Sequence, residues 1–153
     1  MTNTLKFIDL FAGCGGLSLG MEQAGFTPVY VNEINKDALS TYLINRREEF
    51  PYLDDPKFHS RNIKECMEDK FFTTLKRNLK KQHGSSEIDL ICGGPPCQGF
   101  SGIGIRRSYS VDKKHLPSNH LFEDMARFVH KMQPKIFLFE NVQGLMNARW
   151  EKS

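Results

Sequence analysis

A cysteine that follows two prolines is the residue of this chain best placed for nucleophilic chemistry. Residues 89–101 read DLICGGPPCQGFS, in which the apolar run 90–92 has the pattern of a buried strand and GGPP ends that strand. In open parallel sheets, ligands bind outside the carboxyl ends of the strands. We therefore expect Cys97 at the mouth of a binding crevice, where its thiolate would act as a nucleophile. The structural alternative is a small buried residue in a rigid turn.

A glycine-rich turn suggests that this crevice binds a nucleoside. Residues 11–20, FAGCGGLSLG, follow the apolar run 6–10, and their glycines allow the backbone to approach a ligand at a helix amino terminus. The dinucleotide motif G-x-G-x-x-G requires glycine where Ser18 stands, which disfavours a pyrophosphate and a nicotinamide dehydrogenase. Glu33 follows Gly13 by 20 residues, where an acidic residue commonly holds ribose hydroxyls. Together these observations favour S-adenosylmethionine as the ligand. The alternatives are a glycine turn that binds no ligand and, for Glu33, a solvated surface carboxylate.

Alternating strands and helices must position these groups. Apolar runs predict short strands at 6–10, 28–31, 88–92 and 135–139. Helical spacing predicts helices at 17–24, 37–49, 63–81 and 121–132, the second capped by Asn35 and with Ala38, Tyr42 and Leu43 on one face. Residues 51–60 are expected to be irregular. This alternation predicts a doubly wound α/β fold, with a mostly parallel sheet and helices on both faces.

The segment 102–119 has no periodicity and is rich in Gly, Arg, Ser and Lys. Long irregular loops in compact domains commonly serve as lids, and this one begins just after Cys97. We expect a lid over that thiol. The loop would contact phosphates through four cationic side chains, Arg106, Arg107, Lys113 and Lys114. The alternative is that these side chains belong to a solvated loop.

Composition restricts the class of protein. The chain has 153 residues, with 39% hydrophobic and 25% charged, which indicates one domain of an ordinary globular protein. Neither a membrane-spanning run nor a signal peptide is visible, so we expect a cytoplasmic protein without a membrane partner. Cysteines at 14, 66, 92 and 97 lack metal-site spacing, which predicts reduced thiols and no metal. The net charge of +3 is compatible with a polyanionic partner.

Four blocks in a fixed order give a more specific expectation. FIDLFAGCGG, VNE, GGPPCQGFS and FENV span residues 7–142, and together they resemble the amino-terminal half of the DNA cytosine-5 methyltransferases. The resemblance implies a Rossmann-like S-adenosylmethionine-dependent fold, with Cys97 as nucleophile and Glu140 as its acidic partner. It also implies a cofactor site formed by Phe11, Gly13, Cys14, Gly16, Glu33, Ile34, Asn62, Ile63, Pro96 and Leu121.

The family chemistry assigns roles to both catalytic residues. The Cys97 thiolate would add to carbon 6 of a cytosine flipped out of double-stranded DNA, which activates carbon 5 for methylation. Glu140 would donate a proton near nitrogen 3. It follows the apolar run 136–139, where desolvation would raise the pKa of its side chain. The alternative for Glu140 is a capping or loop carboxylate.

The chain departs from the family pattern at three places. Asn62 stands where the family usually has Asp, and Ser118-Asn119-His120 stands where an Arg often precedes Leu121. The family's later blocks, including the target-recognition region, would lie beyond Ser153. We therefore expect residues 1–153 to be a partial catalytic domain of a bacterial restriction-modification system, inactive without its carboxyl-terminal half or a second chain. An RNA cytosine-5 methyltransferase and a non-catalytic cofactor-binding subunit or remnant stay open.

Overall fold

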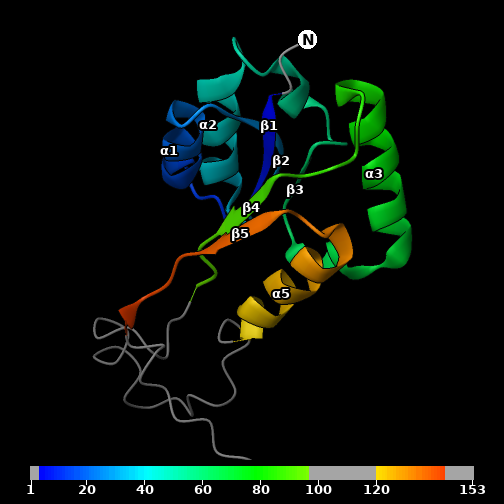
Figure 1. Ribbon diagram of the computed structural model, residues 1–153. Coiled ribbons are helices and arrows are strands. Elements are labelled where there is room, and N and C mark those ends of the chain that lie inside the picture. The colour runs from blue at the N-terminus through cyan, green and yellow to red at the C-terminus, as the bar shows by residue number, and fades with distance from the viewer. Residues whose placement is uncertain (1–3, 97–119, 144–153) are drawn as a thin grey trace, which may run out of the picture.

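The computed structural model describes residues 4–96 and 120–143 (Figure 1). Cys97 and the predicted lid at 102–119 lie outside these residues. The strands are β1 (Leu5–Leu10), β2 (Phe26–Asn32), β3 (His59–Ser60), β4 (Leu90–Gly93) and β5 (Ile136–Phe139). The α-helices are α1 (Gly16–Gln23), α2 (Lys36–Arg46), α3 (Asp69–His83) and α5 (Leu121–Met132), and two 3-10 helices are η1 (Pro51–Asp54) and η2 (Ile63–Met67).

The five strands form one parallel sheet in the order β3-β2-β1-β4-β5. Figure 1 shows α1 and α2 on one side of this sheet and α3 and α5 on the other. The predicted doubly wound α/β fold is confirmed. Because the strand order reverses between β1 and β4, the crevice for a ligand is expected at the carboxyl ends of these central strands.

A bulge explains how a proline enters the sheet interior. Phe7 of β1 pairs with Pro28 of β2, but the next residue, Ile8, pairs with Tyr30, which leaves Val29 as an extra residue. Proline has no N–H for a ladder, so it is tolerated in a strand where the pairing is interrupted. The strand therefore begins at Phe26, two residues before the start predicted from the sequence.

The main core lies between the sheet and the helices that cover it. It combines strand residues with one face of each of the longer helices, and α5 contributes Met125, Phe128 and Met132. The Tyr30 and Phe128 rings stack with their centroids 6.2 Å apart. A smaller cluster of Phe7, Leu90 and Cys92 packs under α1. Burying one such large apolar side chain contributes about 1.5–3 kcal/mol.

Two predicted helices were wrong at their boundaries. Helix α2 ends at Arg46 rather than at residue 49, because Pro51 opens η1 and disfavours helical geometry at Phe50. The helix predicted over 63–81 is divided into η2 and α3, with Glu68 extended between them. The helix at 121–132 has the predicted bounds. Within the two described ranges, no helix has the length and apolar character to cross a bilayer.

Candidate functional site

A cavity of about 280 Å³ opens at the carboxyl ends of the central strands. Its walls come from segments that follow β1, β2, β3 and β4 and from the start of α5. Seven of the ten predicted cofactor residues line it, namely Phe11, Glu33, Ile34, Asn62, Ile63, Pro96 and Leu121. Sequence reasoning missed three further lining residues, Asn32, Arg61 and Gly94. Gly13, Cys14 and Gly16 belong to the adjacent turn rather than to the lining.

The glycine turn is a tight, left-handed structure. Phe11, Gly13 and Gly15 have φ angles of 60°, 56° and 92°, in a region that residues with side chains rarely adopt. The Gly15 N–H donates to the carbonyl of Ala12 at 2.9 Å, which closes the turn. Gly15 was not among the residues predicted for the site. It is the glycine of this turn with the least free space around it.

Glu33 joins the turn to the end of β2. Its Oε2 accepts the Gly13 N–H at 2.8 Å, and its Oε1 accepts the Asn35 N–H at 2.7 Å. The residue is only 9% exposed, so it is not a solvated surface carboxylate. A carboxylate offers about four acceptor positions. Two therefore remain for a ligand with neighbouring hydroxyl groups.

Arg61 and Asn62 make the polar contacts in the other walls of the cavity, which are otherwise mainly apolar. Ile34 is exposed, and its backbone carbonyl accepts hydrogen bonds from Nε and Nη2 of Arg61 at 3.2 and 3.0 Å. Asn62 caps η2, because its Oδ1 accepts the Lys64 N–H at 3.1 Å. An amide oxygen has two lone pairs, so one remains for a ligand N–H.

These residues fit the nucleoside part of S-adenosylmethionine. A carboxylate with spare acceptor positions suits a ribose, and the amide oxygen of Asn62 suits an exocyclic amino group. The apolar side chains of Phe11, Ile34 and Leu121 suit the faces of a purine ring. In the part of the chain that the structure describes, no group of three His, Cys, Asp or Glu side chains is arranged to hold a metal ion.

Glu140 lies beside the segment that leads to Cys97. Its N–H donates to the carbonyl of Gly93 at 3.0 Å, and Asn141 Nδ2 donates to the carbonyl of Pro95 at 3.0 Å. The Glu140 carboxylate lies against the backbone of Gly94. The residue is exposed, so the desolvation predicted at this strand end was wrong for the described structure. The reason is that β5 itself, which presents Glu140, is exposed on both faces.

Behind the turn, a buried polar network occupies the space between β1, α1 and α2. Ser18 donates a hydrogen bond to Oδ2 of Asp9 at 2.5 Å, and its hydroxyl lies 2.8 Å from the Tyr42 hydroxyl. Burial raises the pKa of the Asp9 carboxyl to about 6. At the position where the dinucleotide motif has glycine, the Ser18 hydroxyl is part of this network. In the sequence, this buried network is indicated only by Asp9, a carboxylate within an apolar strand.

Three of the cysteines fall within the described residues, and all three are free. Cys14 is exposed in the glycine turn, whereas Cys66 and Cys92 are buried. Burial raises the pKa of the Cys66 and Cys92 thiols above their ordinary value. Neither has the depressed pKa of a reactive cysteine. Cys97, the nucleophile predicted from the sequence, lies outside the described residues.

Known methyltransferases are similar to this chain along nearly its whole length. Type II methyltransferase M1.HphI of Haemophilus parahaemolyticus is 38% identical over 143 residues, which are 93% of this chain and 33% of that protein. Type II methyltransferase M.AgeI of Thalassovita gelatinovora is 35% identical over 145 residues, 94% of this chain and 29% of that protein. The chain thus spans about a third of the length of these relatives.

Solved structures share the fold. A prophage-encoded candidate DNA modification methyltransferase of E. coli has a TM-score of 0.58 and 36% identity, covering 94% of this chain and 33% of its own. The S. pombe Dnmt2 methyltransferase has a TM-score of 0.54 at 17% identity, covering 95% of this chain and 36% of its own, which shows the fold alone. The family described as C-5 cytosine-specific DNA methylase matches residues 5–153. The chain therefore belongs to the C-5 cytosine-specific DNA methylase family.

Proposed function

We propose that this chain is the cofactor-binding and catalytic part of a methyltransferase that transfers a methyl group from S-adenosylmethionine to carbon 5 of cytosine in DNA. The observation that carries the proposal is the cavity itself. It joins Glu33, with two free acceptor positions, to an apolar pocket, and Pro96 on its wall directly precedes Cys97. The two relatives named above are type II methyltransferases of bacteria, which supports a role in bacterial restriction-modification.

Cys97 and Glu140 would act together on the cytosine ring. The Cys97 thiolate forms a bond to carbon 6, and the displaced electron pair moves through the ring toward nitrogen 3. Glu140 would donate a proton to nitrogen 3 and so prevent charge from building up there, once the bound cytosine and the carboxyl-terminal part cover this strand end. Carbon 5 then becomes nucleophilic. After methylation, nitrogen 3 returns its proton to the Glu140 carboxylate and a water molecule takes the carbon 5 proton. The electron pair of that C–H bond then expels the Cys97 thiolate and restores the aromatic ring.

S-adenosylmethionine bound in the cavity would supply the electrophilic methyl group and leave as S-adenosylhomocysteine. Glu33 would orient its ribose through the hydroxyls, and Asn62 would accept from the adenine amino group. Ile34 would pack against the ring, its position fixed by the two hydrogen bonds from Arg61. A cytosine inside a duplex cannot reach Cys97, so the nucleotide must be flipped out at a cost of a few kcal/mol.

The exposed strand β5 supports a requirement for the carboxyl-terminal part of the methyltransferase. Parallel strands are normally buried on both faces. Ile136 is 63% and Phe137 60% exposed, although their partners on β4, Leu90 and Ile91, are buried. Successive side chains point to opposite faces, so both faces of β5 are uncovered. Among the described strands, β5 also pairs on one edge only.

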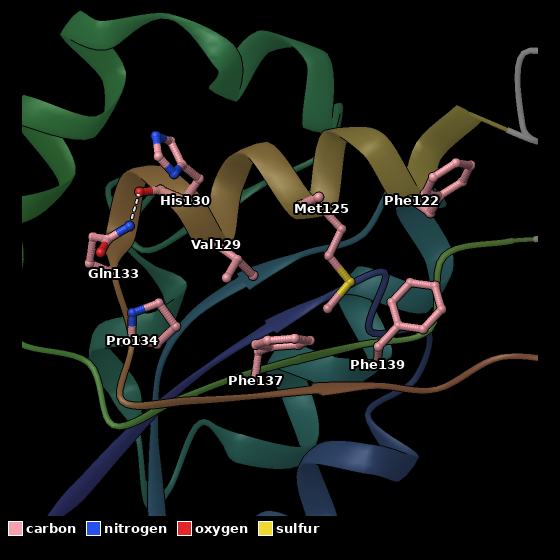
Figure 2. Close-up of a pocket in the computed structure, with 9 residues that line it drawn as sticks. Phe122, Met125, Val129, His130, Gln133, Pro134, Phe137 and Phe139 are labelled. Carbon is pink, nitrogen blue, oxygen red and sulfur yellow. Dashed lines mark hydrogen bonds between the residues drawn. The ribbon is translucent and has the colours of Figure 1, made fainter.

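A groove of about 570 Å³ runs along one of these faces. Figure 2 shows Met125 and Val129 pointing from α5 toward Phe137 and Phe139 of β5. The chain spans about a third of its relatives' length, and the part of those relatives outside the match is large enough to extend such a sheet and fill such a groove. We infer that this surface takes the carboxyl-terminal part and that the chain does not methylate DNA without it.

Titration calorimetry tests the cofactor assignment on the chain itself. S-adenosylhomocysteine is expected to bind and NAD is not. Glu33→Gln is expected to weaken binding about tenfold, because an amide replaces one charged acceptor. The matched control is Glu48→Gln, an exposed carboxylate after α2 that lies outside the cavity. If wild-type chain does not bind S-adenosylhomocysteine, the proposed cofactor site is wrong.

A chimera tests the chemistry. In it, this chain replaces the matching region of M1.HphI, which supplies the carboxyl-terminal part. With S-adenosylmethionine and a duplex containing 5-fluorocytosine, the chimera is expected to form a covalent DNA adduct that Cys97→Ser abolishes. An active chimera that transfers tritiated methyl groups to tRNA and not to duplex DNA would contradict the DNA assignment. Methylation without any adduct would contradict the role of Cys97.

A further inference from the structure

Two buried charged side chains hold neighbouring residues of the glycine turn. Glu33 accepts the Gly13 N–H, whereas Arg46 Nη2 donates to the carbonyl of Gly15 at 3.0 Å. That carbonyl also accepts the Leu19 N–H at 3.0 Å, the first hydrogen bond of α1. Arg46 therefore contacts the turn at the point where it becomes a helix.

Arg46 is itself fixed in one orientation. Its Nε lies 2.6 Å from Glu22 Oε1, and its guanidinium carbon lies 4.0 Å from the centre of the Tyr42 ring. The residue is 6% exposed. A guanidinium is a planar fork that can bind a carboxylate and a carbonyl at once while it stacks on a ring. A lysine ammonium cannot make this set of contacts.

The turn and Arg46 fit closely enough to leave no room for a side chain between them. A Cβ atom at Gly15 would lie 2.5 Å from Arg46 Nη1 and 2.7 Å from Tyr42 Cδ2. The turn contains left-handed residues at Phe11, Gly13 and Gly15. Gly13 and Gly15 adopt this conformation readily, but for Phe11 it is unfavourable and persists only where the surroundings hold it.

We propose that Arg46 is a positioning residue that fixes the glycine turn for cofactor binding through the carbonyl of Gly15. This inference rests on the proposed function, in that the cavity next to the turn binds S-adenosylmethionine. Without the guanidinium, the turn is released at Gly15. The Gly13 N–H is then no longer held in register with Glu33, and Glu33 loses the hydrogen bond that orients it toward the ribose. Arg46 itself touches no cofactor.

The test compares affinity for S-adenosylhomocysteine with the urea midpoint of unfolding, both measured on the full chain. Arg46→Lys keeps the charge and loses the fork, and its affinity is expected to fall about tenfold. In the double variant Arg46→Met with Glu22→Met, both charges of this ion pair are removed together, so neither is left unpaired. We expect its unfolding midpoint to stay near that of wild type while its affinity falls. Arg47→Ala is the matched control, because the adjacent Arg47 is exposed and pairs only with Asp54 among the described contacts.

Each outcome decides a separate point. If either Arg46 variant binds S-adenosylhomocysteine as wild type does, the positioning role is overturned. It is also overturned if weaker binding is fully accounted for by the unfolded fraction at the assay temperature. If the double variant does not fold, Arg46→Lys, assayed below its own unfolding midpoint, still decides. Failure of the wild-type chain to bind indicates instead that the proposed function is wrong.

Discussion

The carboxylate of Glu140 occupies the space that a side chain at Gly94 would need: a Cβ atom built there lies 2.7 Å from Glu140 Oε2. Because the obstructed atom is the end of a flexible side chain, Gly94→Ala is expected to displace Glu140 at little cost in stability. Methyl transfer by the chimera with M1.HphI is expected to fall at least tenfold, since general acids contribute factors of about 10²–10⁴.

A double-mutant comparison identifies the cause of that loss. If Gly94→Ala acts by displacing Glu140, the pair Gly94→Ala with Glu140→Ala is expected to be no slower than Glu140→Ala alone. Rates that multiply would show that Gly94 acts independently of Glu140. Initial rates with tritiated S-adenosylmethionine at saturating DNA measure this.

Gly15→Ala is expected to destabilise the chain by about 2–4 kcal/mol, because the new methyl group overlaps Arg46 and Tyr42 and the backbone is left-handed. The matched control is Gly20→Ala, in the middle of α1. A Cβ atom there meets no other atom within 4 Å. That substitution is expected to stabilise the chain by about 0.5–1 kcal/mol, through helix propensity. Urea unfolding measures both, and a destabilising Gly20→Ala would contradict the described packing of α1.

The buried carboxyl of Asp9 makes stability depend on pH. Its folded-state pKa is raised from 3.8 to about 6, so the folded chain binds the proton more tightly than the unfolded chain does. The contribution of Asp9 to stability is therefore fully present below pH 4 and is lost as the pH rises to 6. Each pKa unit corresponds to about 1.4 kcal/mol, which gives a loss of about 3 kcal/mol.

Asp9→Asn isolates this contribution from the other titrating groups. The difference in unfolding free energy between wild type and Asp9→Asn is expected to fall between pH 4 and pH 6 and to stay constant above pH 7. Asp55 and Asp69 have lowered pKa values and act in the opposite direction, but they cancel in the difference. A difference that does not change with pH would show that Asp9 is not desolvated.

The uncovered strand β5 is expected to make the isolated chain self-associate, since an apolar strand with a free edge readily pairs with another chain. Phe137→Lys and Ile136→Lys are expected to reduce self-association, and to change the free energy of unfolding by less than about 1 kcal/mol because both side chains are exposed. Sedimentation velocity at several concentrations measures the effect. In the chimera, the same substitutions are expected to abolish methylation. An equally active chimera would mean that β5 contacts nothing further.

Residues next to strand ends were the predictable part of the site. Glu33 lies just after the apolar run 28–31 and 20 residues after Gly13, so the local pattern indicated it as a ribose ligand at the edge of a parallel sheet. Phe11 and Pro96 came from the resemblance to the family. Asn62 and Leu121 came from the resemblance, because the two-residue strand β3 is too short for a pattern to reveal. Cys97 stays a prediction, since it lies outside the described residues.

Contacts between distant segments were not predictable. Arg46 reaches Gly15 from another helix, and nothing in the local sequence of α2 indicates an inward-facing arginine. Arg61 was overlooked for the same reason, because its role is to bind the backbone of Ile34 across the cavity. The exposure of Glu140 depends on what covers β5, which a strand pattern alone does not specify.

The position of β1 at the centre of the sheet also sets the order in which the chain can fold. Phe7 pairs on one side with Pro28, close in sequence, and on the other with Leu90, far along the chain. Closing the shorter loop costs less entropy, so β1, the glycine turn and Glu33 can assemble while a nascent chain still lacks β4. Pro96 joins the wall of the cavity only once β4 has paired with β1. A ligand that requires that wall would stabilise the finished sheet but not β1 and β2 paired alone.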